Sequence, residues 1–314
     1  MLPPPNLKVP LFINLFELLR NIIFAYNISN YSLGVIIMSQ ISEHVFQCHI
    51  PDKHYMHPGG TNIYFIGDPK SEMLMLDTGE HDRSWTNQIL DYWKSELNSP
   101  KITAILISHG HQDHIGGIDR IQEAVSAPVR CHPKLAKELR RVLSDDNAVI
   151  PLKSGEMLKT GGGVKLKSFF TPGHAIDHVC YNLSKERVLF TGDTILGASS
   201  SSVMDLSEYM KTLERLSKIR VETICPAHGP VVPSPKGKML AKGYIKHRSM
   251  REEQVISTLR EGISDVESIR KNIYPKNLKK DLHKAASGNI RTHLKKLVKD
   301  EKVEEIEATY KILE

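Results

Sequence analysis

The sequence predicts an α/β protein: a four-layer sandwich of two sheets between helices, followed by a small basic C-terminal domain. Residues 41–235 show strand signals at both ends with helical signals between them, too many strands for a simple βαβ repeat. Single His or Asp residues follow several of the apolar runs, where strands are expected to end. From residue 236 onwards, long helical segments rich in Lys and Arg take over.

The expected elements of residues 41–235 can be placed from their apolar spacing. Strands are predicted at residues 45–50, 61–66, 73–76, 102–107, 164–170, 179–183, 188–190 and 222–225. Helices are predicted at residues 85–97, 118–125, 133–142 and 205–216. Two sheets packed on each other with helices outside would bury these apolar faces, and the polar loops would meet at one edge.

Residues 236–314 are predicted to form a linker helix and a winged-helix-like domain. Helices are expected at residues 236–259 and 265–273, and a third follows Pro275 and ends near Lys299, before a ribbon at 303–306 and 310–313. This region carries 19 Lys and Arg against 12 Asp and Glu, whereas the rest carries 23 against 24. The asymmetry indicates a polyanionic partner or only a solvated helical surface. The residues that could face phosphates are Lys279, Lys280, Lys284, Arg291, Lys295 and Lys296.

Residues 1–40 do not continue this pattern. Polar residues such as Glu17 and Arg20 interrupt the apolar stretch 11–26, so no run long enough for a transmembrane helix remains. The composition also lacks the clean apolar centre of a secretory signal and the Arg and Ser content of a mitochondrial presequence. Met38 stands just before the first expected strand. We interpret residues 1–40 as a weak targeting candidate or as an extension before an alternative start.

Cysteine and serine patterns exclude several other classes of protein. The four cysteines are far apart and form no Cys-x-x-Cys pair, which favours a reducing compartment and small buried thiols. No Gly-x-Ser-x-Gly elbow is present, so a serine hydrolase of that type is not expected.

Residues 108–117 hold the densest group of candidate metal ligands. His109 and His111 alternate across one glycine, so an extended backbone can aim both imidazoles the same way. Asp113 and His114 are adjacent and can face a second centre as the chain turns into a helix. Imidazole and carboxylate are ligands for zinc or another borderline divalent ion.

Three later residues complete the set: His174, Asp193 and His228 each stand beside a glycine just after an apolar run. Alone, each would be an ordinary turn or cap residue. A short turn between the strands expected at 179–183 and 188–190 would bring Asp193 back beside His174. His81 and His178 fit no ligand position, and we interpret them as surface residues or as residues that support the ligands from behind.

The pattern His-x-His-x-Asp-His, followed by a lone His, a lone Asp and a last His, resembles the metallo-β-lactamase superfamily. The resemblance is stronger to a glyoxalase II-related branch that carries a small C-terminal domain, and it extends over about residues 41–314. It includes the segments Gly59-Gly60-Thr61-Asn62, Asp77-Thr78-Gly79, Gly192-Asp193-Thr194-Ile195-Leu196-Gly197 and His228-Gly229-Pro230. Ser108 and Ala227 depart from the more usual Thr and Gly, and neither is a ligand.

This resemblance implies an αββα sandwich that binds two Zn²⁺ per chain. His109, His111 and His174 would hold one ion, and Asp113, His114 and His228 the other. Asp193 would bridge the two ions. A hydroxide shared by the ions would be the nucleophile, and Asp113 would be the catalytic residue that orients it. Asp77 would lie beneath the metal loop in this family, whereas as a bare residue it could be an ordinary turn aspartate.

The resemblance leaves the cleaved bond open. It favours an endoribonuclease that cleaves single-stranded RNA, in the mitochondrial matrix, and the basic C-terminal region agrees with RNA. Glyoxalase II and fungal acyl-carrier-protein thioesterases carry the same metal motif, so a thioester substrate and a cytoplasmic location are the alternatives. A β-lactam is disfavoured for this branch. A metal-stabilised RNA-binding module without catalysis is disfavoured because every ligand is present.

Overall fold

The computed structural model describes residues 39–52, 57, 59–143, 145–307 and 309–312. The expected targeting segment therefore lies almost entirely outside the described residues. Strand β1 (Ser39–Ser42) was not predicted; its Ser39 and Gln40 pair with Gln47 and Phe46 of the next strand. The other domain boundaries stay predictions.

Two sheets form the body of the described unit. The first has seven strands in chain order: β1, β2 (Val45–Ile50), β3 (Thr61–Gly67), β4 (Glu72–Leu76), β5 (Lys101–Leu106), β6 (Val129–Cys131) and β7 (Val149–Pro151). The second runs in the order β12 (Thr223–Pro226), β11 (Val188–Gly192), β10 (Val179–Leu183), β9 (Val164–Phe170) and β8 (Met157–Thr160). Strands β4 to β7 are parallel, and so are β11 and β12. The loops that follow parallel strands gather at one edge.

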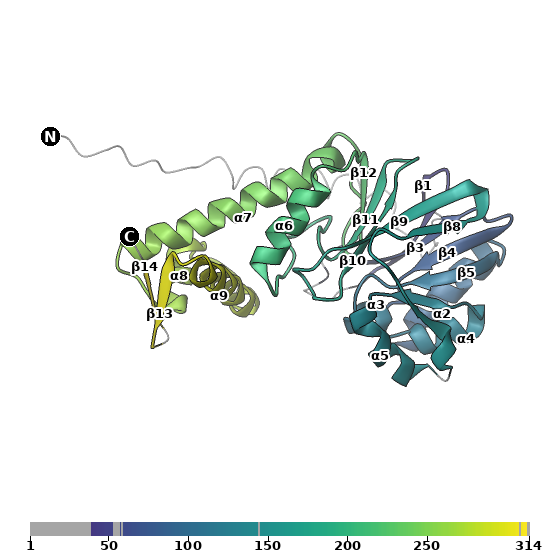
Figure 1. Cartoon of the computed structure of the whole chain (residues 1–314), viewed down its shortest axis with the longest axis horizontal. Helices are drawn as coiled ribbons and strands as arrows, with labels where there is room; N and C mark the ends of the chain where they lie inside the picture. The colour runs from purple at the N-terminus through teal and green to yellow at the C-terminus, as the bar shows by residue number, and fades with distance from the viewer. Residues whose placement is uncertain (1–38, 53–56, 58, 144, 308, 313–314) are drawn as a thin grey trace. The chain divides into compact units, whose positions relative to one another are not determined.

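Helices cover both outer faces of the paired sheets (Figure 1). Those on the first sheet are α2 (Arg83–Asp91), its π-helical continuation η1 (Tyr92–Glu96), α4 (Ile118–Val125) and α5 (Pro133–Val142), with the single turn α3 (Gln112–Ile115) at the sheet edge. On the second sheet lie α6 (Leu206–Leu216) and the start of α7 (Lys236–Arg260). Short 3-10 turns are η2 (Asp146–Ala148), η3 (Gly161–Gly163) and η4 (Lys280–Leu282).

Three separate apolar cores account for four layers. Strand β4 shows why: Met73 and Met75 pack under the helices, whereas Leu74 and Leu76 point into the space between the sheets. This alternation follows from the two-residue period of a strand. A third core joins the second sheet to α6 and α7. The predicted α/β four-layer sandwich is therefore confirmed.

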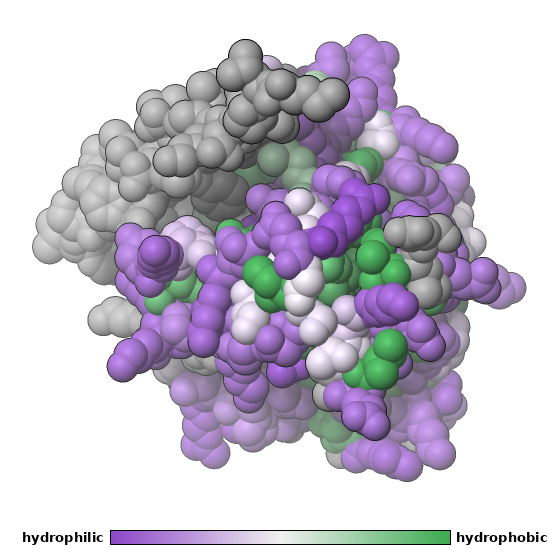
Figure 2. Space-filling model, turned by 90° about the vertical axis from the view of Figure 1, so that its left-hand side faces the viewer, coloured by the Kyte–Doolittle hydropathy of each residue, from purple (hydrophilic) through white to green (hydrophobic). Residues whose placement is uncertain are grey.

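The C-terminal region has its own core. Helices α8 (Val266–Ile273) and α9 (His283–Lys299) and the ribbon β13 (Val303–Ile306) and β14 (Thr309–Ile312) pack on the end of α7. This is the expected order of helices and ribbon. Thr292 Oγ1 of α9 also donates to the Val203 carbonyl of the sandwich at 3.2 Å. Viewed from the side of this domain, the surface is mainly hydrophilic with small hydrophobic patches (Figure 2).

Two further properties concern the described residues as a whole. All four cysteines are buried free thiols. None of the helices in the described ranges combines the length and apolar character needed to cross a bilayer.

Candidate metal centre

The metal loop, residues 108–117, begins where β5 ends and is held from behind by Asp77. Asp77 Oδ1 accepts from the Ser108 backbone N–H at 2.7 Å, and its Oδ2 accepts from Ser108 Oγ at 2.8 Å. The same Oδ2 lies 2.9 Å from His114 Nδ1. These contacts decide between the two interpretations of Asp77. It orients the loop and one of its imidazoles and is not an ordinary turn residue.

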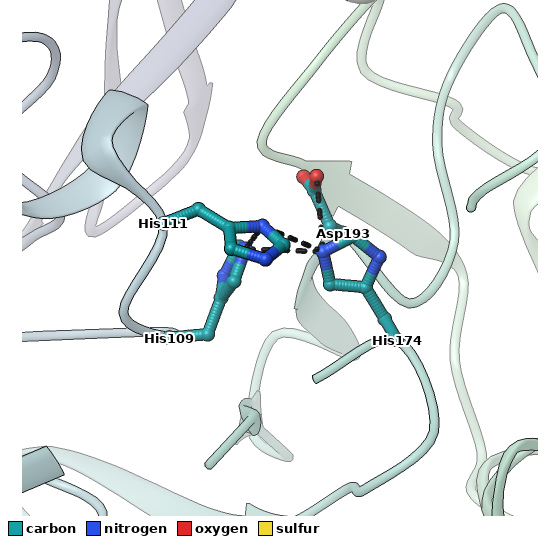
Figure 3. Close-up of side chains that lie close together, drawn as sticks. All are labelled: His109, His111, His174 and Asp193. Atoms are coloured by element: carbon teal, nitrogen blue, oxygen red, sulfur yellow. Dashed lines mark hydrogen bonds and ion pairs between the residues drawn. The ribbon is translucent and has the colours of Figure 1, made fainter. Parts of the chain in front are cut away.

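Three imidazoles converge in the first cluster (Figure 3). His109 Nε2 and His111 Nδ1 are 2.9 Å apart, and His174 Nε2 lies 3.1 Å from each. The other nitrogen of His174 donates to the Ser202 carbonyl at 2.8 Å, so its Nε2 carries a lone pair. Likewise, His109 Nδ1 lies 3.1 Å from the hydroxyl of Ser108. Three imidazole nitrogens that converge at this spacing form the ligand arrangement of a divalent metal site.

A carboxylate and two imidazoles converge in the second cluster. Asp113 Oδ2 lies 2.9 Å from His228 Nε2 and 3.2 Å from His114 Nε2. Both of these nitrogens are buried and lack a well-aligned hydrogen bond, and so does Asp193 Oδ1. Unsatisfied buried polar atoms are rare in folded proteins and call for a ligand or ion. The residues present therefore fit a bound cation.

Asp193 lies between the two clusters, as expected for a bridging carboxylate. Its Oδ2 is 3.6 Å from His174 Nε2, and its Oδ1 is 3.3 Å from His228 Nε2 and 3.6 Å from His114 Nε2. The structure thus brings all seven predicted ligands together: His109, His111, Asp113, His114, His174, Asp193 and His228.

The two histidines without a ligand role take different positions. His178 is fully buried, and its Nε2 accepts from the Asp193 backbone N–H at 3.1 Å. Its Nδ1 lies 2.8 Å from Thr171 Oγ1, so the ring holds Asp193 from behind. His81 lies on the surface and contacts the Gly116 carbonyl at 2.9 Å.

Ionisation agrees with metal binding. Burial lowers the pKa of His109 and His111, and nearby histidines lower these pKa values further, so both rings are neutral. Burial alone would raise the pKa of Asp113, but His114 and His228 outweigh it and lower that pKa. Burial would lower the pKa of His114, but Asp113 and Asp77 outweigh it and raise that pKa. Without a metal, His114 therefore retains its proton between these two carboxylates. A metal cation replaces such a proton on binding.

Helix α7 contacts the loop around Ser201, which the sequence analysis did not single out. Buried Arg248 donates to the Ser201 carbonyl, and the Ser201 hydroxyl lies 3.2 Å from His174 Nδ1. Tyr244 contacts the same loop through Leu196, whose N–H donates to the Tyr244 hydroxyl at 3.0 Å. The linker helix therefore supports a ligand of the first cluster.

Sequence reasoning also missed three residues around His228. Thr61 Oγ1 lies 3.0 Å from His228 Nδ1, and the Asn62 amide donates to the Pro226 and Gly229 carbonyls at 2.9 and 2.8 Å. Thr61 and Asn62 belong to the Gly59-Gly60-Thr61-Asn62 segment of the resemblance, which was the available signal for these two residues. His57 also faces this cluster, and no sequence pattern marked it.

Comparison with known families agrees with this geometry. The model of the metallo-beta-lactamase superfamily matches residues 57–228. The chain belongs to the metallo-β-lactamase superfamily. The model of the beta-lactamase associated winged helix domain matches residues 266–311, which confirms the winged-helix domain. Members of the superfamily are typically hydrolases that bind metal ions, and the His and Asp clusters fit that description.

The curated relatives include fungal members of the superfamily. The chain is 35% identical over 204 residues to the lactamase-like protein nscB of Aspergillus fumigatus, covering 65% of this chain and 58% of that protein. It is 32% identical over 222 residues to the lactamase-like protein adaB of Aspergillus niger, covering 71% and 66%. The matched region thus spans less than two thirds of each relative.

Solved structures of the superfamily share the fold. A beta-lactamase domain protein from Burkholderia ambifaria superimposes with a TM-score of 0.74 at 16% identity, covering 91% of this chain and 96% of that one. A metallo-beta-lactamase family protein from Thermus thermophilus gives 0.69 at 19% identity, covering 87% and 100%. At these identities the likeness concerns the fold alone.

Proposed function

We propose that the protein is a dinuclear zinc hydrolase that cleaves thioesters of apolar acyl groups. The observation that carries this substrate class is an apolar cleft beside the metal ligand His111. The cleft has a volume of about 260 Å³ and is lined by Gly110, His111, Lys134, Leu135, Glu138, Ala175, Ile176, Asp177 and Met204. A substrate seated there would meet the ligand shell directly.

The side chains that line this cleft favour an apolar substrate group. Ile176 is 61% exposed and Met204 72% exposed, although both are large apolar side chains. Leu135 also lines the cleft and is buried. Exposed apolar side chains that gather around a catalytic group mark a ligand surface.

The charges of the cleft favour an apolar substrate over RNA. Lys134 is the one Lys or Arg among its described lining residues, against the carboxylates of Glu138 and Asp177. No Phe, Tyr or Trp is among these described residues, so none of them offers a base a stacking platform of that kind. A polyanionic strand needs cations along its path. The order of preference drawn from the sequence is therefore reversed.

Each of the two clusters would bind one of the two zinc ions. His109, His111 and His174 would hold one zinc ion, Asp113, His114 and His228 the other, and Asp193 would contact both. Two bound zinc ions would supply an activated water and polarise the carbonyl oxygen of the substrate. Asp113, whose side chain is 12% exposed, would orient that water as it ligates. Asp77 and His178 keep the ligands in place from behind.

Cleavage of single-stranded RNA is the second candidate, and one observation favours it. Five of the six basic side chains that we singled out are exposed: Lys279, Lys280, Lys284, Arg291 and Lys295. The sixth, Lys296, is paired with Glu252 at 3.0 Å and with Asp300 at 2.6 Å. An exposed basic surface could supply electrostatic affinity for a nucleic acid.

A panel of substrates separates the two candidates. Zinc-loaded protein should hydrolyse a medium-chain acyl thioester and leave single-stranded RNA and the β-lactam nitrocefin largely intact. Replacing Ile176 with Glu should raise KM for the acyl thioester by about tenfold, because a charge replaces apolar contacts in the cleft. The matched control is Met157→Glu, an exposed methionine outside the cleft, which should leave KM unchanged.

The same panel can overturn the proposal. RNA cleavage without thioester hydrolysis would establish the second candidate. In that case, changing Lys279, Lys280 and Lys284 to Glu should weaken RNA binding and flatten its salt dependence, because fewer counterions are released.

A further inference from the structure

His57 faces the second cluster from a segment that no ligand motif covers. Its Nε2 lies 3.2 Å from Asp113 Oδ2, the oxygen that also contacts His114 and His228. The His57 ring stacks on the His228 ring with centroids 4.2 Å apart and planes 3° from parallel. His57, Asp113 and His228 offer ligand atoms that all lie within 4.8 Å of one another.

Backbone contacts fix His57 in this place. Its carbonyl accepts from the Gly60 N–H at 2.9 Å, and the Gly60 carbonyl accepts from the Gly229 N–H at 3.0 Å. Gly60 has φ of 82°, and a Cβ there would lie 2.6 Å from the His49 ring, so glycine is required at this turn. The turn that carries His57 is thus bonded to the residue that follows His228.

The second ring nitrogen of His57 has the partner expected of a metal ligand. His57 Nδ1 donates to Asp52 Oδ2 at 2.5 Å. His114 Nδ1 contacts Asp77 and His228 Nδ1 contacts Thr61 in the same way. A ligating histidine typically gives its outer N–H to a carboxylate or another oxygen, which directs the other nitrogen at the metal.

We propose that His57 is a further ligand of the second metal position and that Asp52 orients it. The ligand set there becomes His57, Asp113, His114 and His228, with Asp193 shared with the first position. This inference rests on the dinuclear centre of the proposed function. With His57, the second position has one ligand that precedes β3 in the chain. Metal binding would then hold His57 next to Asp113 and His228.

Metal affinity tests the proposal without relying on turnover. In His57→Ala, zinc affinity of the second position, measured by competition with a chromophoric chelator, should fall on the order of 10–100-fold while the first position keeps its affinity. Cobalt substituted at the second position should show an altered visible spectrum. Adding imidazole should restore both the affinity and the spectrum, because it fills the vacated ligand position.

Three controls make the result specific. His81→Ala changes a histidine beside the metal loop that does not face the cluster, and should leave both affinities unchanged. Asp52→Asn should weaken the second position less than His57→Ala does. If His57→Ala folds poorly, as judged by melting of the metal-free protein, His57→Asn serves in its place.

Other outcomes overturn the inference. A His57 that only pairs with the carboxylates of Asp52 and Asp113 would compete with the cation, so its removal would leave second-site affinity unchanged or tighter. Wild-type protein with two zinc ions and this response would reject the His57 ligand and keep the proposed function. Wild-type protein that binds no metal would reject both.

Discussion

The ligands around the metal loop and the lysines of the C-terminal domain are held in opposite ways. At the sandwich edge, His114 Nε2, Asp193 Oδ1 and His228 Nε2 are buried, face one another and lack well-aligned hydrogen bonds. In the C-terminal domain, Lys296 is paired with Glu252 and Asp300, and most other lysines are exposed. Convergent and unsatisfied groups indicate chemistry, whereas paired or solvated charges indicate folding and solubility.

Helix α7 connects the two regions. Its Arg248 is 3% exposed, lies over the Tyr209 ring at 5.4 Å and donates to the Ser201 carbonyl next to His174. No carboxylate within ion-pair distance of this guanidinium was found among the described residues. Burying a guanidinium costs free energy unless hydrogen bonds and neighbouring groups compensate, and here the Ser201 carbonyl and the Tyr209 ring do so. Arg248 therefore links the C-terminal region to the loop that contacts His174, one of the candidate ligands.

The largest effect in this comparison should come from Asp193→Ala. Loss of the carboxylate that contacts both clusters should lower metal occupancy at both positions and reduce hydrolysis by more than about 100-fold, since even an outer partner of a ligand is worth 10–100-fold. Metal analysis and steady-state rates measure it. Asp205→Ala, which changes the N-cap of α6, is the control and should retain both metals. Full turnover in Asp193→Ala would refute the bridging position.

An intermediate effect should come from Arg248→Ala. Without the guanidinium, the loop at Ser201 and Ser202 loses its anchor, and zinc affinity of the first position should fall by about tenfold. Arg248→Lys should recover part of this affinity. Lys295→Ala, an exposed change on α9, should alter nothing. Equal first-site affinity in all three variants would show that the C-terminal region is independent of the metal centre.

The smallest effect concerns acid stability of the C-terminal domain. Burial, followed by Arg248 and Arg251, lowers the pKa of His293 from 6.5 to about 3. Below pH 6.5 the unfolded chain binds a proton that the folded chain does not. The free energy of unfolding therefore decreases by about 1.4 kcal/mol for each unit by which the pH is lowered below 6.5. His293→Leu should remove this loss.

The measurement is the difference in unfolding free energy between the wild type and His293→Leu from pH 7 to pH 5. Both proteins are measured metal-free, so that loss of metal at low pH does not contribute to the difference. A difference that does not change with pH would contradict the lowered pKa.

Long periodic elements could be predicted from the sequence almost to the residue. The strand Val45–Ile50 and the helix Ile118–Val125 have the expected bounds, because each has enough residues to show its period. The short strands β1, β6, β7 and β8 and helix α3 were missed, because three or four residues carry no period. Pairing with neighbours, which depends on the whole fold, determines such short elements.

The candidate site divides in the same way. His109 and His114 stand in a local motif whose spacing predicts ligands. Arg248 could not be identified, because its role depends on where a helix packs 47 residues after its contact Ser201. His57 likewise meets Asp113 only after two distant loops fold together. Contacts between such distant segments are not encoded in local spacing.

Metal content of the purified wild-type protein tests the central claim most directly. Native mass spectrometry after zinc loading and removal of excess metal should show about two zinc ions per chain, because two clusters of convergent, unsatisfied ligands share Asp193. Protein that carries one zinc ion or none under these conditions would contradict the dinuclear centre on which the proposed function depends.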